Sequence, residues 1–278
     1  MAPQLQLHEA TYPQLIEAWL SAVEPFADLA ESLSAEQWAA PSVLPGWSNA
    51  DIVAHVVGIE RDLLGDPTPS ADLDWEQLPH ADDLFSRYTE LAVAMRRGVP
   101  QAEVTAELRK TIAARREALA EEPGALGDIV RGPGGWELPR GVVIRMRCFD
   151  IWVHDQDIRA GIGEPGDLGT PAAWVAADRM LSGLERTWAR DVKAPAGATA
   201  EVTVTGPGVE FVAAVTADDN GRGRLIEPPA EPTVRLTMDW PTFVARSAGR
   251  AYPEIGSPRA EGDPELTERL LTNFNVAP

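Results

Sequence analysis

The sequence RMRCFDIWVHDQD, residues 145–157, forms the middle of a stretch that predicts a long helix over about 140–160. Two glycines directly after this stretch are typical of a helix end. Within the helix Asp150 and His154 are four residues apart, so their side chains point the same way about one turn apart. They are close enough to hold one ion. The alternative is an exposed carboxylate–histidine pair on the helix surface.

Three further helical segments precede this one. The sequence predicts them at residues 12–33, at 49–64 and at 82–121, the last interrupted near 98–100 by glycine and proline. Ser48 and Asp51 have the spacing of an N-terminal capping box for the second of them. The glycine- and proline-rich residues 132–139 are expected to form a loop. Four main helices are the number needed for an antiparallel bundle.

The pattern changes in the second half of the chain. A fifth helix is predicted from Pro171 to about Arg190, followed by a linker. Alternating residues at 201–205 and 210–216, separated by a Gly-Pro-Gly turn, then predict a hairpin. Another strand at 233–238 and two short helices complete this part, and Asp263 caps the second helix.

These segments predict an α+β protein with two domains. The N-terminal domain is a four-helix bundle over residues 1–165, and the C-terminal domain is a small α+β fold over residues 199–278. Residues 166–198 are interpreted as a connecting helix and linker.

Composition excludes several classes of partner. The formal net charge is −19, from 43 acidic and 24 basic residues, so the chain repels the phosphate backbone of nucleic acid and disfavours anionic membranes. No stretch approaches the roughly 20 apolar residues that span a bilayer, and the N-terminus lacks the features of a signal peptide. We therefore expect a cytoplasmic protein with small-molecule partners.

His55 is the third candidate site residue. It lies three residues after Ile52 and four before Ile59, at the edge of the apolar stripe of the second helix, so its side chain is expected to point into the bundle. A histidine on an apolar face can simply be a core residue. Here, however, Asp150 and His154 provide polar neighbours on the fourth helix.

The three residues together predict a metal site. Helical bundles build such sites from inward-facing carboxylates and histidines on different helices, and three ligands leave a fourth position open for water or substrate. An open site is catalytic in type. Arg147 and Asp157 lie near the same helix face and are predicted to orient the ligands, with a salt bridge at the end of the bundle as the alternative.

Two motifs resemble a known family. The run LPGWS at residues 44–48 leading to His55, and the later run FDIWVH at residues 149–154, resemble the mycothiol-dependent maleylpyruvate isomerase family, whose members share a DinB-like four-helix bundle. The C-terminal runs Gly249-Arg250, 262–266 and Leu270-Leu271 are similar to the second domain of that family.

The resemblance implies a zinc ion on His55, Asp150 and His154 and a mycothiol whose sulfur attacks an electrophile. The family usually has glutamate where this chain has Asp150. Aspartate is one methylene shorter, so the helix must lie closer to the metal or the ion must shift. The expected metal is therefore zinc or another divalent ion. The resemblance also implies an arginine of the second domain, for which Arg250 and Arg259 are candidates, and we predict Arg250.

The single cysteine, Cys148, lies about 200° around the helix from Asp150 and is interpreted as a small buried hydrophobe. If the protein carries out thiol chemistry, the working thiol is expected to come from a bound cofactor. His80 is expected at the surface, and Trp47, Trp136 and Trp152 are candidates to line the site.

The expected function is metal-dependent transfer of the mycothiol sulfur to an electrophilic small molecule. The alternatives are a thiol-dependent cis–trans isomerase of a maleylpyruvate-type substrate, a metalloenzyme that uses no thiol, and a non-catalytic binding protein on the same fold.

Overall fold

A computed structural model describes residues 10–275 except 68, 122–123 and 254. The chain divides into two compact units, the first over residues 10–165 and the second from residue 166 onward.

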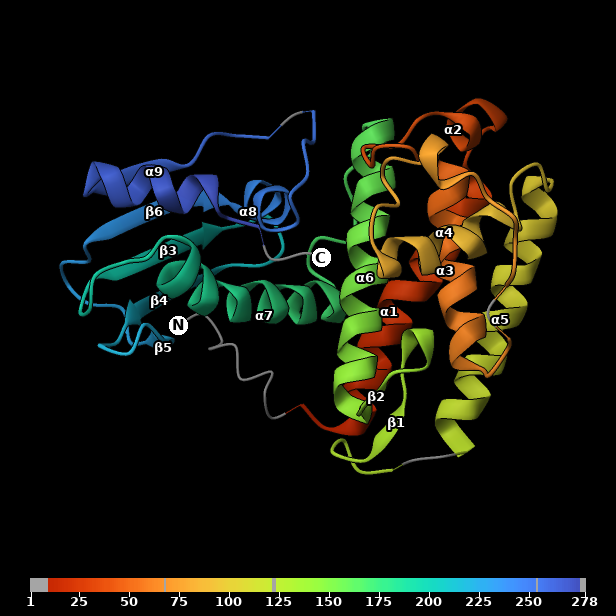
Figure 1. The fold of residues 1–278 in the computed structure, drawn as a ribbon, viewed down its shortest axis with the longest axis horizontal. Helices are drawn as coiled ribbons and strands as arrows, with labels where there is room; N and C mark the ends of the chain where they lie inside the picture. The colour runs from red at the N-terminus through yellow and green to blue at the C-terminus, as the bar shows by residue number, and fades with distance from the viewer. Residues whose placement is uncertain (1–9, 68, 122–123, 254, 276–278) are drawn as a thin grey trace. The chain divides into compact units, whose positions relative to one another are not determined.

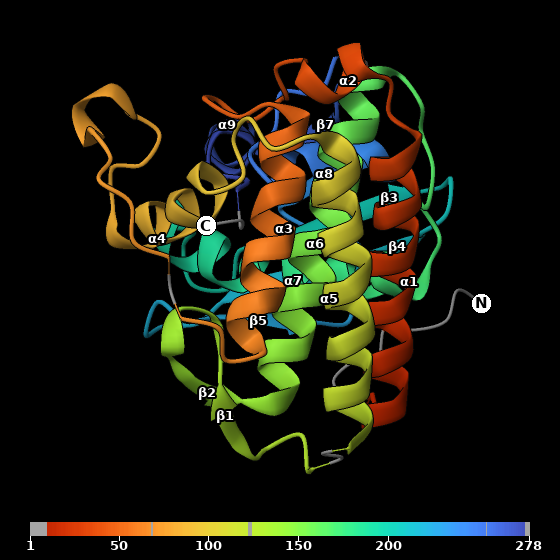
Figure 2. The same ribbon diagram turned by 90° about the vertical axis from the view of Figure 1, so that its right-hand side faces the viewer.

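The first unit is a helical bundle. Its four long helices lie side by side, with α1 against α5 and α6, and α3 against the same two (Figures 1 and 2). These helices are α1 (Tyr12–Ser32), α3 (Asn49–Leu63), α5 (Gln101–Glu121) and α6 (Arg140–Ile162). Three smaller elements are α2 (Ala35–Ala39), the 3-10 turn η2 (Trp75–Gln77) and α4 (Leu84–Ala94), and α4 packs on α3. The helical segments predicted from the sequence are therefore confirmed.

The ends of α3 and α6 follow from local chemistry. The Ser48 hydroxyl accepts a hydrogen bond from the Asp51 backbone N–H at 3.2 Å, and the Asp51 carboxylate accepts one from the Ser48 backbone N–H at 2.9 Å. This capping box fixes where α3 begins. The α6 helix ends at Gly163, whose φ of 72° lies in the left-handed region that favours glycine. The capping box and this stop fix the start of α3 and the end of α6.

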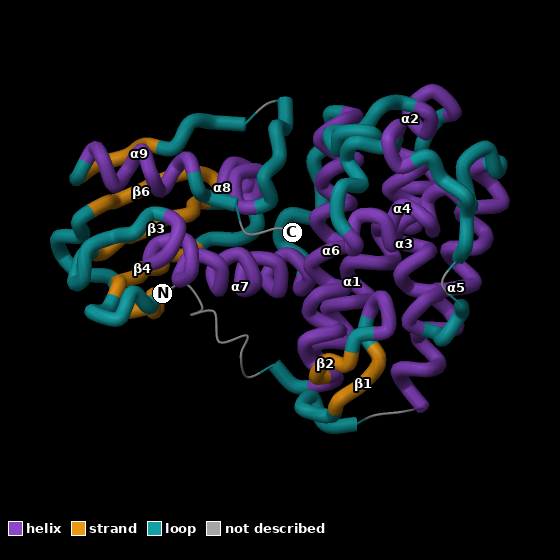
Figure 3. The backbone as a smooth tube through the Cα atoms, in the orientation of Figure 1, coloured by secondary structure: helices purple, strands orange, loops and turns teal. Residues whose placement is uncertain are grey.

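The loop expected at residues 132–139 is instead part of a small hairpin. Strands β1 (Ile129–Arg131) and β2 (Glu137–Pro139) pair antiparallel around the turn η3 (Pro133–Gly135), and Figure 3 shows them as the strands beside the bundle helices. Gly134 and Gly135 both have positive φ, which makes the tight reversal possible. Strands of three residues are too short to show an alternating pattern, so these strands have no signal that can be recognised along the chain.

The second unit is a five-stranded mixed sheet with helices, in the strand order β5-β4-β3-β6-β7. The predicted hairpin is the antiparallel pair of β3 and β4, and β6 pairs parallel to β3. The strands are β3 (Thr199–Thr205), β4 (Phe211–Ala217), β5 (Gly223–Ile226), β6 (Val234–Asp239) and β7 (Arg259–Gly262). The helical elements are α7 (Pro171–Arg186), the π-helical turn η4 (Thr187–Asp191), α8 (Trp240–Ser247) and α9 (Pro264–Thr272).

Helix α7 differs from its predicted role. It was interpreted as part of a connection over residues 166–198, but it packs on β4 and β5 and belongs to the second unit. Its apolar stripe explains this, because Val175, Met180 and Leu184 are buried there.

Each unit has its own core. Trp19, Phe26 and Trp152 are fully buried in the bundle. In the second unit Trp240 stacks on Phe243 with ring centroids 5.7 Å apart. The predicted α+β fold with two domains is thus confirmed. No helix in the described part of the chain has the length and apolar character that crossing a membrane requires.

Candidate metal centre

His55, Asp150 and His154 converge inside the bundle. Helix α3 supplies the first and α6 the other two, and one ligand atom from each lies within 4.8 Å of the others. His55 Nε2 is 3.2 Å from Asp150 Oδ2, and His154 Nε2 is 3.7 Å from Asp150 Oδ1. The two imidazole rings meet edge to face, with centroids 4.9 Å apart. Since α3 and α6 pack together, the predicted inward direction of His55 is what brings the three residues to one place.

Burial and neighbouring charges act on the protonation of His55 and Asp150. His55 and His154 are buried, whereas the Asp150 side chain keeps 29% of its surface exposed, so the cluster is reachable from one side. Burial lowers the pKa of the His55 imidazole, which favours the neutral form that binds metals. Burial by itself raises the pKa of the Asp150 carboxyl, but the charges of Arg147, His55 and His154 outweigh it and hold that pKa well below its usual value.

The donor set fits a divalent metal. Two imidazole nitrogens and one carboxylate oxygen are ligands that zinc takes in open, catalytic-type sites. The Nδ1 of His154 lies 2.9 Å from Asp157 Oδ2, so its Nε2 is left facing Asp150. A carboxylate behind a ligating histidine is the arrangement that fixes the ring and its tautomer in metal sites. Asp157 is fully buried, so this contact is shielded from water.

Arg147 contacts the cluster through Asp150. Its Nη1 donates to Asp150 Oδ2 at 2.8 Å, and its Nε donates to Glu60 Oε1 at 2.7 Å. Glu60 is fully buried and also accepts from Arg115 Nε at 3.1 Å. Glu60 is not among the residues predicted for the site, although its position four residues after Val56 places a charged residue on the apolar stripe of α3. A chain of buried charges therefore connects Asp150 to α3 and α5.

Trp47 lies against the two histidines. Its ring centroid is 5.2 Å from that of His55 and 6.3 Å from that of His154. Of the other two tryptophans considered for the site, Trp152 is buried in the core and Trp136 is 61% exposed.

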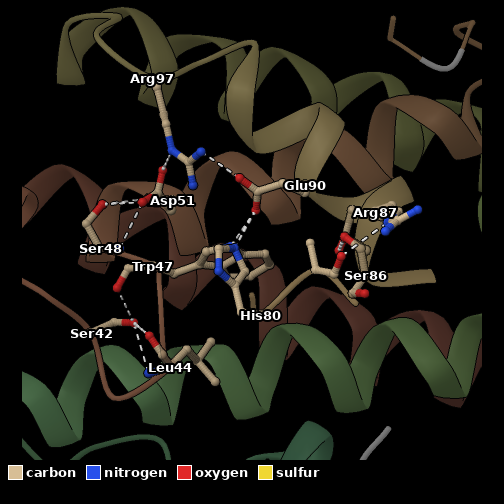
Figure 4. A network of polar contacts seen from close by, with 12 residues as sticks. Ser42, Leu44, Trp47, Ser48, Asp51, His80, Ser86, Arg87, Glu90 and Arg97 are labelled. Atoms are coloured by element: carbon tan, nitrogen blue, oxygen red, sulfur yellow. Dashed lines mark hydrogen bonds and ion pairs between the residues drawn. The ribbon is translucent and has the colours of Figure 1, made fainter. Parts of the chain in front are cut away.

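His80 was expected at the surface, and this is wrong. Its Nε2 lies 3.1 Å from Oε2 of the fully buried Glu90, and only 17% of its side chain is exposed (Figure 4). Glu90 lies on α4, ten residues after His80, a separation that has no recognisable motif. Only the folded path of the loop between α3 and α4 brings the two together.

Three residues considered in the sequence remain, namely Cys148, Arg250 and Arg259. Cys148 is fully buried, its thiol lies 3.8 Å from the Leu15 carbonyl oxygen, and burial raises its pKa. This agrees with a small core residue. Arg250 and Arg259 belong to the second unit, where Arg250 Nη1 donates to the Ala248 carbonyl at 2.8 Å and Arg259 pairs with Glu261 at 2.6 Å. A role of either arginine at the metal centre stays a prediction.

A histidine–aspartate–histidine cluster that could hold a metal ion lies inside a helical bundle, and an α+β unit follows this bundle along the chain. Residues 19–159, which are half of the chain, match the family described as the mycothiol maleylpyruvate isomerase N-terminal domain. The chain belongs to this family.

Solved structures agree with this fold. The chain is similar to the crystal structure of the mycothiol-dependent maleylpyruvate isomerase, with 15% identity, a TM-score of 0.54 and coverage of 89% of this chain and 93% of that one. A histidine-to-alanine mutant of that isomerase matches with 16% identity, a TM-score of 0.53 and the same coverage. No curated protein matches the sequence.

Proposed function

We propose that this protein is a metal-dependent enzyme that uses mycothiol as a nucleophile and transfers its sulfur to an electrophilic small molecule. The observation that supports this most strongly is the cluster of His55, Asp150 and His154, whose ligand atoms lie within 4.8 Å of one another in a chain of the mycothiol maleylpyruvate isomerase family. The metal is proposed to be zinc or another divalent ion.

The residues of the cluster have separate tasks in this proposal. His55, Asp150 and His154 would hold the ion, Arg147 keeps the Asp150 carboxylate in place, and Asp157 holds the His154 ring. A divalent ion bound there would lower the pKa of a thiol that reaches its open position, so that the thiol reacts as the thiolate. The exposed part of Asp150 marks the side from which that thiol would arrive.

Sulfur transfer and isomerisation begin with the same step. In transfer, the thiolate forms a C–S bond with an electrophilic carbon and a leaving group departs with the bonding electrons. In isomerisation, the thiolate adds to a conjugated double bond, the resulting single bond rotates, and the C–S bond breaks to restore the double bond. The second candidate, a cis–trans isomerase of a maleylpyruvate-type substrate, is supported by the similarity of the fold to the mycothiol-dependent maleylpyruvate isomerase.

An adduct assay separates these possibilities. Zinc-loaded protein is incubated with mycothiol and 1-chloro-2,4-dinitrobenzene, and the thioether is quantified; a parallel reaction follows the isomerisation of maleylpyruvate. His55→Ala tests the metal site. Glu107→Gln is the matched control, because Glu107 pairs with Arg61 and Arg96 and none of these is part of the cluster.

The transfer proposal predicts thioether formation that needs protein, zinc and mycothiol, is lost in His55→Ala and is kept in Glu107→Gln. Isomerisation without thioether would support the second candidate. A zinc-loaded protein inactive in both reactions would refute thiol chemistry and leave a thiol-independent metalloenzyme or a binding protein. A cytoplasmic location, predicted from the sequence, is where thiols are kept reduced.

Arg250 is proposed to bind the substrate, since a guanidinium holds a carboxylate or carbonyl oxygen in a fixed geometry. Arg250→Ala is expected to lower kcat/KM, whereas Arg259→Ala, which removes a side chain that is 80% exposed, is expected to leave it unchanged. Equal effects of the two substitutions would contradict the assignment.

A further inference from the structure

We propose that Trp47 forms a wall of the metal centre that contacts the bound thiol or electrophile through its ring face, and that Glu90 is the residue that positions it. This inference rests on the proposed function and adds a residue that selects what binds there. It starts from the position of the indole, which lies beside both histidine rings at centroid distances of 5.2 and 6.3 Å.

The indole of Trp47 is held in place by a hydrogen bond to Glu90. The Trp47 Nε1–H donates to Glu90 Oε2 at 2.8 Å, and Glu90 has no exposed surface. Arg97 Nη1 lies 2.5 Å from Glu90 Oε1, and Arg97 Nε also donates to Asp51 at 3.0 Å. Asp51 belongs to the capping box of α3, together with the N-cap residue Ser48. These contacts of Glu90 with Trp47 and Arg97, named the clamp here, connect the loop of Trp47 to α4. Through Asp51 they also reach the first turn of α3, the helix that carries His55 (Figure 4).

The backbone before Trp47 is fixed as well. Gly46 has a φ of +82°, and a Cβ built on it would lie 2.2 Å from His80 Nδ1. The His80 ring thus occupies the space where any other residue at position 46 would place its side chain. Because His80 is itself held by Glu90, the same carboxylate restrains Trp47 from the side chain and from the preceding turn.

The clamp decides what the wall can offer. The indole has one hydrogen-bond donor, and Glu90 uses it. What remains is the π face, which packs on C–H-rich or planar conjugated groups. Two sources have this chemistry in the proposed reaction, the substituent carried by the thiol and a conjugated electrophile, and the experiment tests them separately.

Indole N–H signals provide a readout that does not depend on activity. In a 15N-correlated spectrum of the full chain, the signal lost in Trp47→Phe belongs to Trp47. Zinc is added first, then mycothiol in one sample and maleylpyruvate in another. We expect the Trp47 signal to shift with zinc and to shift again with the ligand that lies on the ring, which identifies the source.

Kinetics test the role of Glu90. Glu90→Gln weakens the clamp by removing the charge, and Trp47→Phe removes the same hydrogen bond while the Glu90–Arg97 ion pair stays. Each is expected to raise KM about tenfold, the equivalent of one hydrogen bond to a charged group, with kcat changed less than about twofold. The double variant should be no worse than Trp47→Phe alone, because Glu90 is proposed to act on KM through the indole hydrogen bond, which Trp47→Phe already removes. Glu107→Gln is the control that leaves KM unchanged.

Several results would overturn the inference. If the unmutated chain binds zinc but the Trp47 signal moves with neither zinc nor ligand, the wall does not face the site. If Glu90→Gln and Trp47→Phe each leave KM unchanged, or their effects add, Glu90 does not act through Trp47. Absence of zinc binding by the unmutated chain would instead refute the proposed function, and this inference with it.

Discussion

Replacing Glu60 by alanine is a demanding test of how the bundle is held together around the metal centre. Glu60 has no exposed surface and bridges two buried arginines, Arg147 at 2.7 Å and Arg115 at 3.1 Å. Glu60→Ala leaves both guanidinium groups buried without their shared carboxylate. Arg147 keeps its contact with Asp150, but Arg115 retains only a long contact, 3.5 Å, to the Leu63 carbonyl.

The expected cost is large. Removing one partner of a buried ion pair destabilises a protein by about 3–5 kcal/mol, because the remaining charge is left uncompensated. For a domain of this size, each kcal/mol lowers the melting temperature by roughly 2–4 °C, so a drop of about 6–20 °C follows. Arg109→Ala is the comparison: Arg109 is one-third exposed among Glu24, Asp28 and Glu31, and exposed ion pairs contribute about 0–1 kcal/mol.

The assay is urea unfolding of the full chain in a chelator, so that bound metal adds no stability. Because the chain has two units, far-ultraviolet circular dichroism is followed across the whole transition and the part that shifts is assigned to the bundle. Glu60→Gln, which keeps the shape and loses the charge, should lie between alanine and the unmutated chain. A loss below about 1 kcal/mol in Glu60→Ala, equal to that of Arg109→Ala, would show that Glu60 does not hold the two buried arginines in place.

Three further outcomes are expected. Asp157→Asn should lower zinc affinity about 10–100-fold while the fold is retained, because the residue behind a ligating histidine tunes its orientation; a competition titration with a zinc chelator measures this, and an unchanged affinity would contradict the contact's role. Cys148 should not react with a disulfide reagent at about pH 8 until the chain is unfolded, since it has no exposed surface and burial raises its pKa; rapid labelling of the folded chain would show that α6 opens. In metal-free protein, burial lowers the pKa of His55 in the folded state only, so the unfolded chain takes up the proton first and stability should fall as the pH drops below about 6.5. His55→Gln should reduce the slope of unfolding free energy against pH between about 5 and 6.5, and equal slopes would show that His55 titrates alike in both states.

The helices of the bundle could be predicted because their signals are local. Capping by Ser48 and Asp51, the apolar stripe of α3 and the glycine stop after α6 each lie within a few residues of the feature that they set. Strands β1, β2, β5 and β7 were not predicted. They have three or four residues each, and β7 is exposed along its whole length, so no alternation of buried and exposed positions marks it.

The candidate ligands could be predicted for a similar reason, since the spacing of Asp150 and His154 and the stripe position of His55 are readable along single helices. Their partners were harder. Glu60 meets Arg147 across 87 residues of sequence and Glu90 meets Trp47 across 43, and only the packing of α3, α4 and α6 creates these pairs. A glutamate on an apolar helix face is the one signal that could have pointed to a buried partner.

The metal content of the purified chain tests directly whether His55, Asp150 and His154 bind an ion. The full chain is loaded with zinc, freed of excess by gel filtration and analysed by elemental mass spectrometry, beside His55→Ala, Asp150→Asn and the control Glu107→Gln. We expect about one zinc per chain in the unmutated protein and the control, and a large loss in the other two variants. A protein that retains no zinc, or that retains it equally without His55 and Asp150, would contradict the assignment of this cluster as a metal centre.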